Sequence, residues 1–346
     1  MEKIKETFLV TGAAGFIGAA LVNKLLDNGQ NVVGVDNLNN YYDPELKKVR
    51  LSNISAKDKK TEEHWSFEEV DISNEEALKS IFKKYHPTVV INLAAQAGVR
   101  YSIENPFVYS KSNLVGFLNI LEQCRKNKIK HLIYASSSSV YGGNKSLPYK
   151  ENDQVNHPIS FYAATKKSNE LMAHSYSHIY NMPCTGLRFF TVYGPWGRPD
   201  MAPMIFAESI LKEKPIKIFN YGNMSRDFTY IDDVAEALLK ICFKEATVNK
   251  NFDYLNPESS TSFAPHRIFN IGNGNPTNLI DFINILEKEL GRKAIRNYYP
   301  IQAGDVESTF ADVQALYKWI GFRPNVDIEN GVKQFAKWFL SYYSNK

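Results

Sequence analysis

The stretch FLVTGAAGFIGAALVNKLL, residues 8–26, decides the fold class of this chain. It opens with a short apolar run typical of a buried strand, and the apolar positions after Phe16 recur with the period of a helix. Gly12, Gly15 and Gly18 stand between the two. The first glycine permits a tight turn, the second lets the backbone approach a pyrophosphate, and the third lets the helix pack closely on the strand. The stretch therefore predicts a nucleotide-binding strand–turn–helix unit.

The rest of the first half repeats this alternation of strand and helix. Several of the apolar runs are apolar on both faces, as strands of a parallel sheet covered by helices are. Strands are predicted at 7–11, 31–36, 65–70, 88–93, 131–136 and 183–190, and helices at 16–27, 74–85, 106–126 and 161–180. We therefore expect an α/β fold of the Rossmann type, with a doubly wound parallel sheet.

Composition argues against several classes of protein. The chain has 346 residues and a formal net charge of +4, with its lysines spread out, so a nucleic-acid-binding surface is not expected. No apolar stretch approaches the length of a membrane span, and residues 1–12 carry no apolar signal-peptide core. Cys124, Cys184 and Cys242 are widely spaced and suit free thiols in a reducing compartment. We expect a cytoplasmic protein.

Asp36, at the end of the second predicted strand, points to the nucleotide. A carboxylate there can accept hydrogen bonds from both ribose hydroxyls of an adenosine. Neither Asn37 nor Leu38 is a cation that could hold a 2′-phosphate, so NAD is expected rather than NADP. The residues expected to contact NAD are Gly12, Ala14, Gly15, Phe16, Ile17, Gly18, Asp36, Asn37, Asp71, Ile72, Leu93, Ala94, Ala95, Gln96, Asn113, Tyr162 and Lys166.

Tyr162 and Lys166 are four residues apart and share one face of the predicted helix 161–180. A phenol with an unperturbed pKa near ~10 is mostly protonated at neutral pH. A nearby ammonium favours the phenolate and makes it a usable general base, and the same lysine can bind the nicotinamide ribose. Ser137, at the end of a predicted strand, is expected to share the reacting oxygen of the substrate with Tyr162.

The second half is less regular. Residues 191–203 are dense in Gly and Pro, residues 220–227 predict a turn, and residues 249–266 predict an exposed polar loop. Helices are predicted at 204–212, 231–243, 278–290, 312–320 and 327–343, and a late strand at 267–272. We expect an NAD-binding domain over 1–190, to which pieces at about 228–246 and 266–272 return, and a smaller mixed α/β substrate lobe over most of 191–346.

The pattern resembles the extended short-chain dehydrogenase/reductase superfamily over nearly the whole chain. The resemblance rests on the glycine turn, Asp36, the serine-bearing strand, Tyr162 with Lys166, and RFFTVYGP at 188–195. Within the superfamily the chain is most similar to the UDP-glucuronate 4-epimerase family. Five segments carry this similarity: NLNNYYDPELKKVRL (37–51), AAQAGVRYSIENP (94–106), RFFTVYGPWGRPDMA (188–202), RDFTYIDDV (226–234) and GDVESTFAD (304–312).

The resemblance implies a nucleotide-sugar substrate across the C-terminal lobe. It places Thr191 and Arg198 at the sugar carboxylate, which a guanidinium can bind with forked hydrogen bonds. Gln302 stands where many relatives have an arginine, which leaves one phosphate contact open. The expected substrate-binding residues are Arg100, Ser136, Ser137, Ser138, Ser139, Thr191, Arg198, Arg226, Gln302 and Asp305. The resemblance also implies a homodimer paired through helices 106–126 and 161–180.

The serines of the segment HLIYASSSSVYGG (131–143) distinguish between related reactions. Related 4,6-dehydratases resemble this strand but carry Asp-Glu where Ser138 and Ser139 stand, and related UDP-glucuronate decarboxylases tend to keep a glutamate at the position of Ser139. Hydroxyls can hold a sugar carboxylate but supply no carboxylate for proton transfer at C5. A 4-keto glucuronate is a β-keto acid that can lose carbon dioxide. Our hypothesis is that the serines fix its carboxylate in a pose that discourages this loss.

Three alternatives to a UDP-glucuronate 4-epimerase stay open. They are an epimerase of an uncharged or N-acetylated UDP-hexose, a UDP-glucuronate decarboxylase, and a non-catalytic dinucleotide sensor. The intact set of Tyr162, Lys166 and Ser137 argues against the sensor, which needs no base. His174 and His178 are four apart on a helix, but no acidic residue stands between them and no third ligand is evident, so no metal site is expected.

Overall fold

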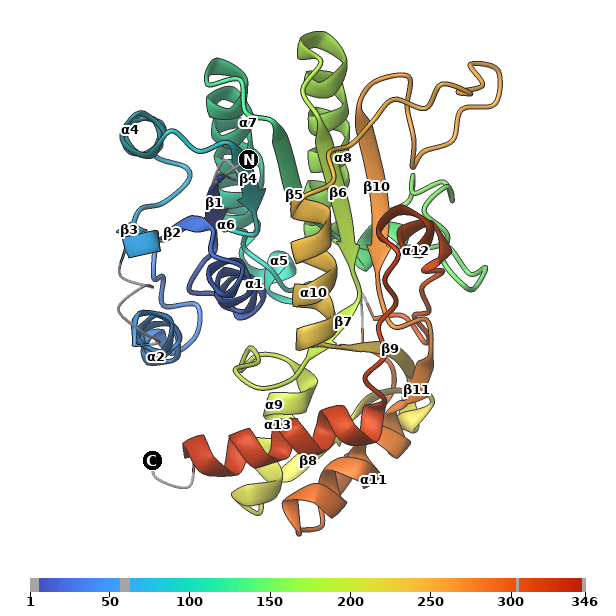
Figure 1. Cartoon of the computed structure of the whole chain (residues 1–346). Helices are drawn as coiled ribbons and strands as arrows, with labels where there is room; N and C mark the ends of the chain where they lie inside the picture. The colour runs from blue at the N-terminus through green and yellow to red at the C-terminus, as the bar shows by residue number, and fades with distance from the viewer. Residues whose placement is uncertain (1–5, 57–62, 303–304, 344–346) are drawn as a thin grey trace.

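The computed structural model describes residues 6–56, 63–302 and 305–343. A parallel sheet of seven strands in the order β10-β6-β5-β4-β1-β2-β3 forms its centre (Figure 1). Its strands are β1 (Thr7–Thr11), β2 (Asn31–Asp36), β3 (Trp65–Glu69), β4 (Val89–Asn92), β5 (His131–Ser137), β6 (Cys184–Phe189) and β10 (His266–Ile271). The strand order reverses between β1 and β4, as in a doubly wound sheet. The predicted Rossmann-type fold is confirmed.

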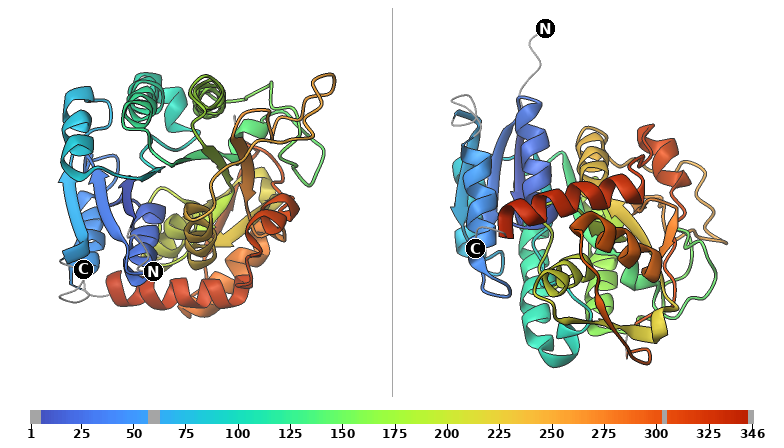
Figure 2. Two further views of the ribbon diagram at one scale, coloured as in Figure 1. Left: turned by 45° about the horizontal axis from the view of Figure 1, so that its top comes forward. Right: turned by 90° about the horizontal axis from the view of Figure 1, so that it is seen from below.

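Helices cover both faces of this sheet (Figure 2, left). One face carries α1 (Phe16–Asp27) and α10 (Ile231–Cys242), and the other carries α4 (Glu75–Tyr85), α7 (Gly116–Lys126) and α8 (Phe161–Tyr180). Phe8 and Val10 belong to the apolar cluster that includes α1 and α10, whereas Leu9 between them belongs to the cluster that includes α4 and α7. Because successive side chains point to opposite faces and both faces are buried, the strands are continuous apolar runs in the sequence.

The second half leaves the sheet and then returns to it. β10 pairs in parallel with β6, with His266 opposite Cys184. Apart from one helix that packs beside β10, the remaining elements lie at one end of the large sheet (Figure 1) and include a three-stranded sheet, β11-β9-β7, and a two-stranded sheet, β12-β8. They are β7 (Thr191–Tyr193), α9 (Ala202–Leu211), β8 (Pro215–Ile218), β9 (Ser225–Tyr230), β11 (Pro276–Asn278), α11 (Leu279–Leu290), β12 (Ile295–Tyr298), α12 (Gln314–Ile320) and α13 (Ile328–Tyr343). The division into two domains stays a prediction.

The structure differs from the sequence-based prediction in several segments. Residues 106–126, predicted as one helix, are α6 (Pro106–Tyr109), a π-helical turn (Ser110–Val115) and α7. Strands β7 and β9 begin within segments predicted as irregular or as a turn. Helix α2 (Pro44–Ser55) was not predicted at all. Its buried residues include Lys47 and Arg50, so it lacks the apolar periodicity by which a helix is recognised.

Two further features concern the helices and the cysteines. No helix within the described part of the chain is long and apolar enough to cross a membrane. Cys124, Cys184 and Cys242 are all buried free thiols. Burial raises the pKa of the Cys124 thiol well above its ordinary value. The cysteines therefore act as small apolar core residues in this structure.

Candidate active site

A cavity of about 370 Å³ lies where the strand order of the large sheet reverses. This is the position at which doubly wound sheets bind ligands, and the volume is that of a small-molecule site. The predicted cofactor-binding residues that line it are Gly12, Gly15, Phe16, Ile17, Gly18, Asp36, Asn37, Asp71, Ile72, Leu93, Ala94, Ala95, Gln96, Tyr162 and Lys166. Ala14 and Asn113 were also predicted but are buried outside the lining. The Asn113 side chain instead holds the backbone N–H and carbonyl of Gln96, at 2.8 and 3.0 Å.

The three glycines of the first turn are explained by backbone contacts. Gly12 has φ +70°, and a Cβ there would lie 2.8 Å from the Ala94 nitrogen. A Cβ at Gly18 would lie 2.0 Å from the Gly12 carbonyl oxygen. Helix α1 begins after Gly15 without a side-chain cap, so its first N–H groups are left for another acceptor. A helix N-terminus of this kind fits the pyrophosphate of a dinucleotide.

Asp36 is held at the end of β2 by the backbone around it. Its Oδ2 accepts from the Ala14 N–H at 3.2 Å, and its Oδ1 accepts from the Leu38 N–H at 2.9 Å. Lys47 from α2 approaches Oδ1 to 3.8 Å and forms a buried ion pair. The carboxylate keeps lone pairs for ribose hydroxyls, so it fits an adenosine. Sequence reasoning missed Lys47 because only the positions beside Asp36 were considered.

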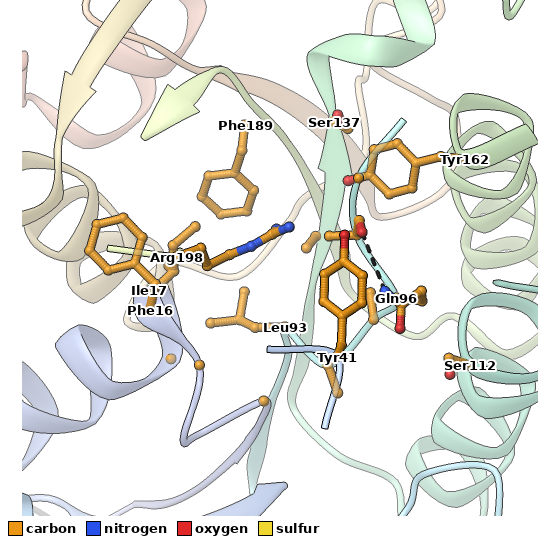
Figure 3. Close-up of a pocket in the computed structure, with 18 of the residues that line it drawn as sticks. Phe16, Ile17, Tyr41, Leu93, Gln96, Ser112, Ser137, Tyr162, Phe189 and Arg198 are labelled. Carbon is orange, nitrogen blue, oxygen red and sulfur yellow. Dashed lines mark hydrogen bonds between the residues drawn. The ribbon is translucent and has the colours of Figure 1, made fainter. Parts of the chain in front are cut away.

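The predicted catalytic residues meet in the cavity. Figure 3 shows the Ser137 and Tyr162 side chains on the same side of it, and Lys166 also lines it. Ser137 ends β5, and Tyr162 lies in the first turn of α8, which begins after the capping residue Ser160. Burial raises the pKa of Tyr162, and a hydrogen bond with Ser137 and the charge of Arg198 only partly offset this. The phenol is therefore protonated at neutral pH.

Lys166 is engaged differently from what the sequence suggested. Its Nζ donates to the Ala135 carbonyl at 2.7 Å, and burial lowers the pKa of its ammonium to about 7. We expected this ammonium to favour the phenolate form of Tyr162. In the structure, the positive charge that lowers the pKa of Tyr162 is that of Arg198, which comes from a distant segment. The action of Lys166 on Tyr162 and on a ribose stays a prediction.

A buried network of hydrogen bonds supports β5, the strand that carries the serines. Ser136 Oγ donates to Glu170 Oε1 at 2.7 Å. Glu170 in turn forms a forked ion pair with the buried Arg188, with Nε–Oε1 and Nη2–Oε2 distances of 2.9 and 3.0 Å. The Ser136 hydroxyl proton is thus directed to Glu170, although Ser136 lines the cavity. Ser137 Oγ accepts from the Ser139 N–H at 3.1 Å, which fixes the turn that carries Ser138 and Ser139.

Arg198 enters the cavity from the side opposite Tyr162 and Ser137 (Figure 3). Its side chain is 23% exposed, and its Nε donates to Asp200 Oδ1 at 3.0 Å while Nη2 donates to Oδ2. Burial lowers the pKa of the guanidinium, but the Asp200 carboxylate more than offsets this. Thr191 lines the same cavity. Asp200 was not singled out in the sequence, although it lies two residues from Arg198.

The remaining predicted substrate residues gather in an adjoining hollow. Arg226 and Asp305 line it together with Ser138, Ser139 and Thr191. Arg100 lies outside its lining but pairs with Asp305, with 3.0 Å between Nη2 and Oδ2. Gln302 lines neither hollow, and its buried Oε1 has no hydrogen-bond partner among the described residues. The structure thus brings together all the predicted substrate residues except Gln302.

The two helical histidines have structural contacts. His174 Nε2 lies 2.7 Å from Ser262 Oγ, and the rings of His174 and His178 both pack edge-on against Phe263. Across the described ranges, no group of three or more His, Cys, Asp or Glu side chains could hold a metal ion.

Comparison with known proteins decides the family. The model of the NAD dependent epimerase/dehydratase family matches residues 8–272. The chain belongs to this family. It is 51% identical to "Protein CapI" of Staphylococcus aureus over 335 residues, which cover 97% of this chain and 98% of that protein. It is 44% identical to "Probable UDP-glucuronate 4-epimerase" of Rhizobium meliloti (strain 1021) over 342 residues, covering 97% of both.

A solved structure supports the same assignment of this epimerase/dehydratase family member. The UDP-glucuronic acid 4-epimerase from Bacillus cereus, in complex with UDP-glucuronic acid and NAD, matches it with a TM-score of 0.84 and 31% identity. The match covers 97% of this chain and 100% of that one. The superfamily inferred from the sequence is confirmed. NAD is confirmed as the cofactor, since the family is NAD-dependent and the glycine turn and Asp36 fit it.

Proposed function

We propose that this family member is a UDP-glucuronate 4-epimerase that interconverts UDP-glucuronate and UDP-galacturonate with tightly held NAD. The observation that carries the proposal is the placement of Arg198 across one cavity from Tyr162 and Ser137 (Figure 3). A cation that can bind a carboxylate thus faces a base and a hydroxyl that can act on a neighbouring alcohol. The NAD supplies the chemistry of accepting a hydride from C4 and giving it back.

The residues of the chain handle the proton and the orientation of the sugar. The phenolate form of Tyr162, reached when the phenol gives its own proton to solvent, takes the proton of the C4 hydroxyl as that oxygen becomes a carbonyl, and Ser137 donates a hydrogen bond to the same oxygen. The 4-keto sugar then turns over in the pocket. Tyr162 returns the proton when C4 is reduced on its other face, so the cycle consumes nothing else.

The sugar end favours an epimerase over relatives that eliminate water or carbon dioxide. Ser138 and Ser139 line both hollows and offer only hydroxyls at the positions where those relatives were expected to carry acids. Without a carboxylate there, no side chain at these positions can transfer a proton at C5. Hydrogen bonds from the serines, Thr191 and Arg198 hold the sugar carboxylate, which disfavours its loss from the β-keto acid.

The direct test is to incubate the purified protein with UDP-glucuronate, without added NAD, and to follow products by proton NMR. UDP-galacturonate is the expected product, and its appearance also shows that NAD is retained. A UDP-pentose with carbon dioxide would instead identify a decarboxylase. Lack of turnover of UDP-glucuronate and of other UDP-hexoses, even with NAD added, would identify a sensor.

The first prediction concerns Arg198 and the choice between acidic and neutral sugars. Both carboxylate oxygens of Asp200 already accept hydrogen bonds from the Arg198 guanidinium, which favours an uncharged UDP-hexose as the second candidate substrate. If Arg198 binds the sugar carboxylate, Arg198→Ala removes a charge-assisted hydrogen bond and weakens UDP-glucuronate binding about ten- to hundredfold. UDP-glucose binding should change less than about threefold. The affinity of Arg198→Lys for UDP-glucuronate should lie between those of the unaltered protein and of Arg198→Ala. Equal weakening of both ligands contradicts the carboxylate assignment.

We also propose that the protein acts as a cytoplasmic homodimer. Large apolar side chains are exposed along α6, the π-helical turn, α7 and α8, which is typical of an interaction surface. They are Phe107, Val115, Leu118, Leu171 and Ile179. The buried free thiols suit a reducing compartment. Light scattering at micromolar concentration should give the mass of two chains, and a monomer would contradict the pairing.

A further inference from the structure

The segment from Asn39 to Leu51, which includes the first two turns of α2, connects the nucleotide end of the cavity with the loop that carries Arg198. It is part of the sequence that resembles the epimerase family, yet the proposed chemistry assigns it no role. Its buried charged residues, Lys47 and Arg50, are 5% and 3% exposed. Charged side chains are rarely buried unless they are paired, so their partners indicate what the segment does.

Arg50 joins two loops that are far apart in the sequence. Its Nη1 donates to the Ala14 carbonyl at 3.0 Å, in the glycine turn, and to the Tyr42 hydroxyl at 2.8 Å. Its Nη2 donates to the carbonyls of Trp196 and Gly197, at 2.6 and 3.2 Å. Trp196 has φ +65°, which is uncommon for a residue with a side chain, so the loop needs such support. One guanidinium therefore fixes the backbone immediately before Arg198.

Tyr41 acts on the other side of Arg198. Its hydroxyl donates to Asp200 Oδ2 at 3.2 Å. Asp200 binds the Nε and Nη2 edge of the Arg198 guanidinium, which leaves the Nη1 end for a ligand. Figure 3 shows Tyr41 beside the end of the Arg198 side chain that points into the cavity. Tyr41 thus holds the carboxylate that sets the direction of the guanidinium.

Packing holds the Tyr41 ring independently of this hydrogen bond. The ring lies 5.0 Å from that of Tyr101, centroid to centroid. On another side it lies 6.4 Å from the ring of Tyr42, centroid to centroid. Removal of the hydroxyl alone should therefore leave the ring in place. This makes Tyr41→Phe a clean test of the bond to Asp200.

We propose that Tyr41 and Arg50 are positioning residues that bracket Arg198 and orient it toward the carboxylate of the sugar. The inference rests on the proposed function, in which Arg198 binds that carboxylate. Because Arg50 also holds the glycine turn, and Lys47 one turn away pairs with Asp36 at 3.8 Å, the same helix ties recognition of the acidic sugar to the NAD end.

The test measures ligand affinity by calorimetry with UDP-glucuronate and UDP-glucose, in a Tyr162→Phe background that slows turnover about 10²- to 10⁴-fold. Tyr41→Phe should raise the Kd of UDP-glucuronate about three- to tenfold, as loss of a hydrogen bond to a charged group does, and change that of UDP-glucose less than about twofold. Arg50→Lys should raise the Kd of UDP-glucuronate at least about tenfold, since one ammonium cannot reach the four acceptors that the Arg50 guanidinium contacts. Tyr101→Phe, in the same ring stack, should change neither Kd.

Kinetics with Tyr162 intact provide a second readout. Tyr41→Phe should raise KM for UDP-glucuronate by the same factor as Kd and leave kcat within about threefold, because the lost interaction orients the ligand rather than the base. NAD content after purification should be unchanged in Tyr41→Phe and reduced in Arg50→Lys. A purely structural defect would lower kcat and weaken both ligands together.

Arg198→Ala in the same background separates failure of this inference from failure of the proposed function. If Arg198→Ala leaves the ratio of the two Kd values unchanged, the proposed function is wrong. If Arg198→Ala changes that ratio but Tyr41→Phe does not, only the positioning role is wrong. Weakening of both ligands by one factor in Tyr41→Phe also overturns that role. If Arg50→Lys does not fold, Tyr41→Phe alone decides.

Discussion

The two ends of the active-site cavity are built in different ways. At the NAD end, the glycine turn that leads from β1 into α1 and Asp36, which closes β2, come from one continuous stretch, residues 8–36, and act largely through backbone. The sugar end is formed by side chains from separate elements, among them Ser137 on β5, Tyr162 on α8 and Arg198 in the loop after β7. A local motif specifies the first end, whereas the second exists only after the fold has formed.

The largest effect is expected from a single methyl group at the NAD end. A Cβ at Gly18 would lie 2.0 Å from the Gly12 carbonyl oxygen, which is backbone and cannot move without opening the turn. Gly18→Ala should therefore yield protein without NAD and without turnover, destabilised by about 1–3 kcal/mol. NAD content and thermal unfolding measure this. Gly143→Ala is the control, since its Cβ would have no neighbour closer than 3.8 Å, and retention of NAD by Gly18→Ala would refute the backbone account.

An intermediate effect is expected where the two ends meet. Tyr162→Phe should lower kcat by about 10²- to 10⁴-fold, the usual contribution of a general base, because no phenol remains to take the C4 proton. NAD content and the Kd of UDP-glucuronate should stay close to those of the unaltered protein. Tyr180→Phe, at the exposed end of the same helix, should have no effect on kcat. Loss of NAD from Tyr162→Phe would show that the two ends are not separable.

The smallest effect tests whether the choice between NAD and NADP depends only on residues 8–36. Asp36→Asn removes the carboxylate that pairs with Lys47 and leaves its ammonium only the neutral oxygens of Asn39 among the partners described, so that it can attract a 2′-phosphate. The affinities for NAD and NADP are measured by titration of protein from which bound NAD has been removed. We expect the variant to bind NAD about tenfold more weakly, as for loss of one charge-assisted contact, and to prefer NAD over NADP by a smaller factor. Addition of Lys47→Met should remove the gain in NADP affinity. If the gain persists, Lys47 has no part in coenzyme choice.

The fold was predictable from the sequence because its strands are buried on both faces and stand out as apolar runs. Helix α2 was not, because Lys47 and Arg50 occupy its buried face and their partners lie in other loops. The same physical reason limits prediction of the site. Glycines and Asp36 act through neighbours a few residues away, whereas the contacts of Arg198 with Asp200, and of Asp200 with Tyr41, depend on which loops the topology brings together.

Two of the predicted contacts stay predictions, because the side chains concerned already have partners within the protein. Asn113 was expected at the cofactor, yet its amide is used to hold the Gln96 backbone. Ser136 was expected at the substrate, yet its hydroxyl bonds Glu170. A sequence shows that a polar side chain is near a site but not whether it faces the ligand or supports a residue that does. Arg226 and Asp305 could be placed only through the resemblance to a known family.

Strand β10 is synthesised long after β6, the strand with which it pairs, and this has a consequence for folding during synthesis. Strand β6 pairs with β5 along one edge and with β10 (His266–Ile271) along the other. Until the ribosome has added those residues, β6 is an open edge whose unpaired N–H and C=O groups can bind another chain. The sheet is complete only when β10 pairs with β6, and a contact of such long sequence separation slows folding. A fragment that stops at residue 190 should therefore aggregate on expression rather than fold as an independent nucleotide-binding module.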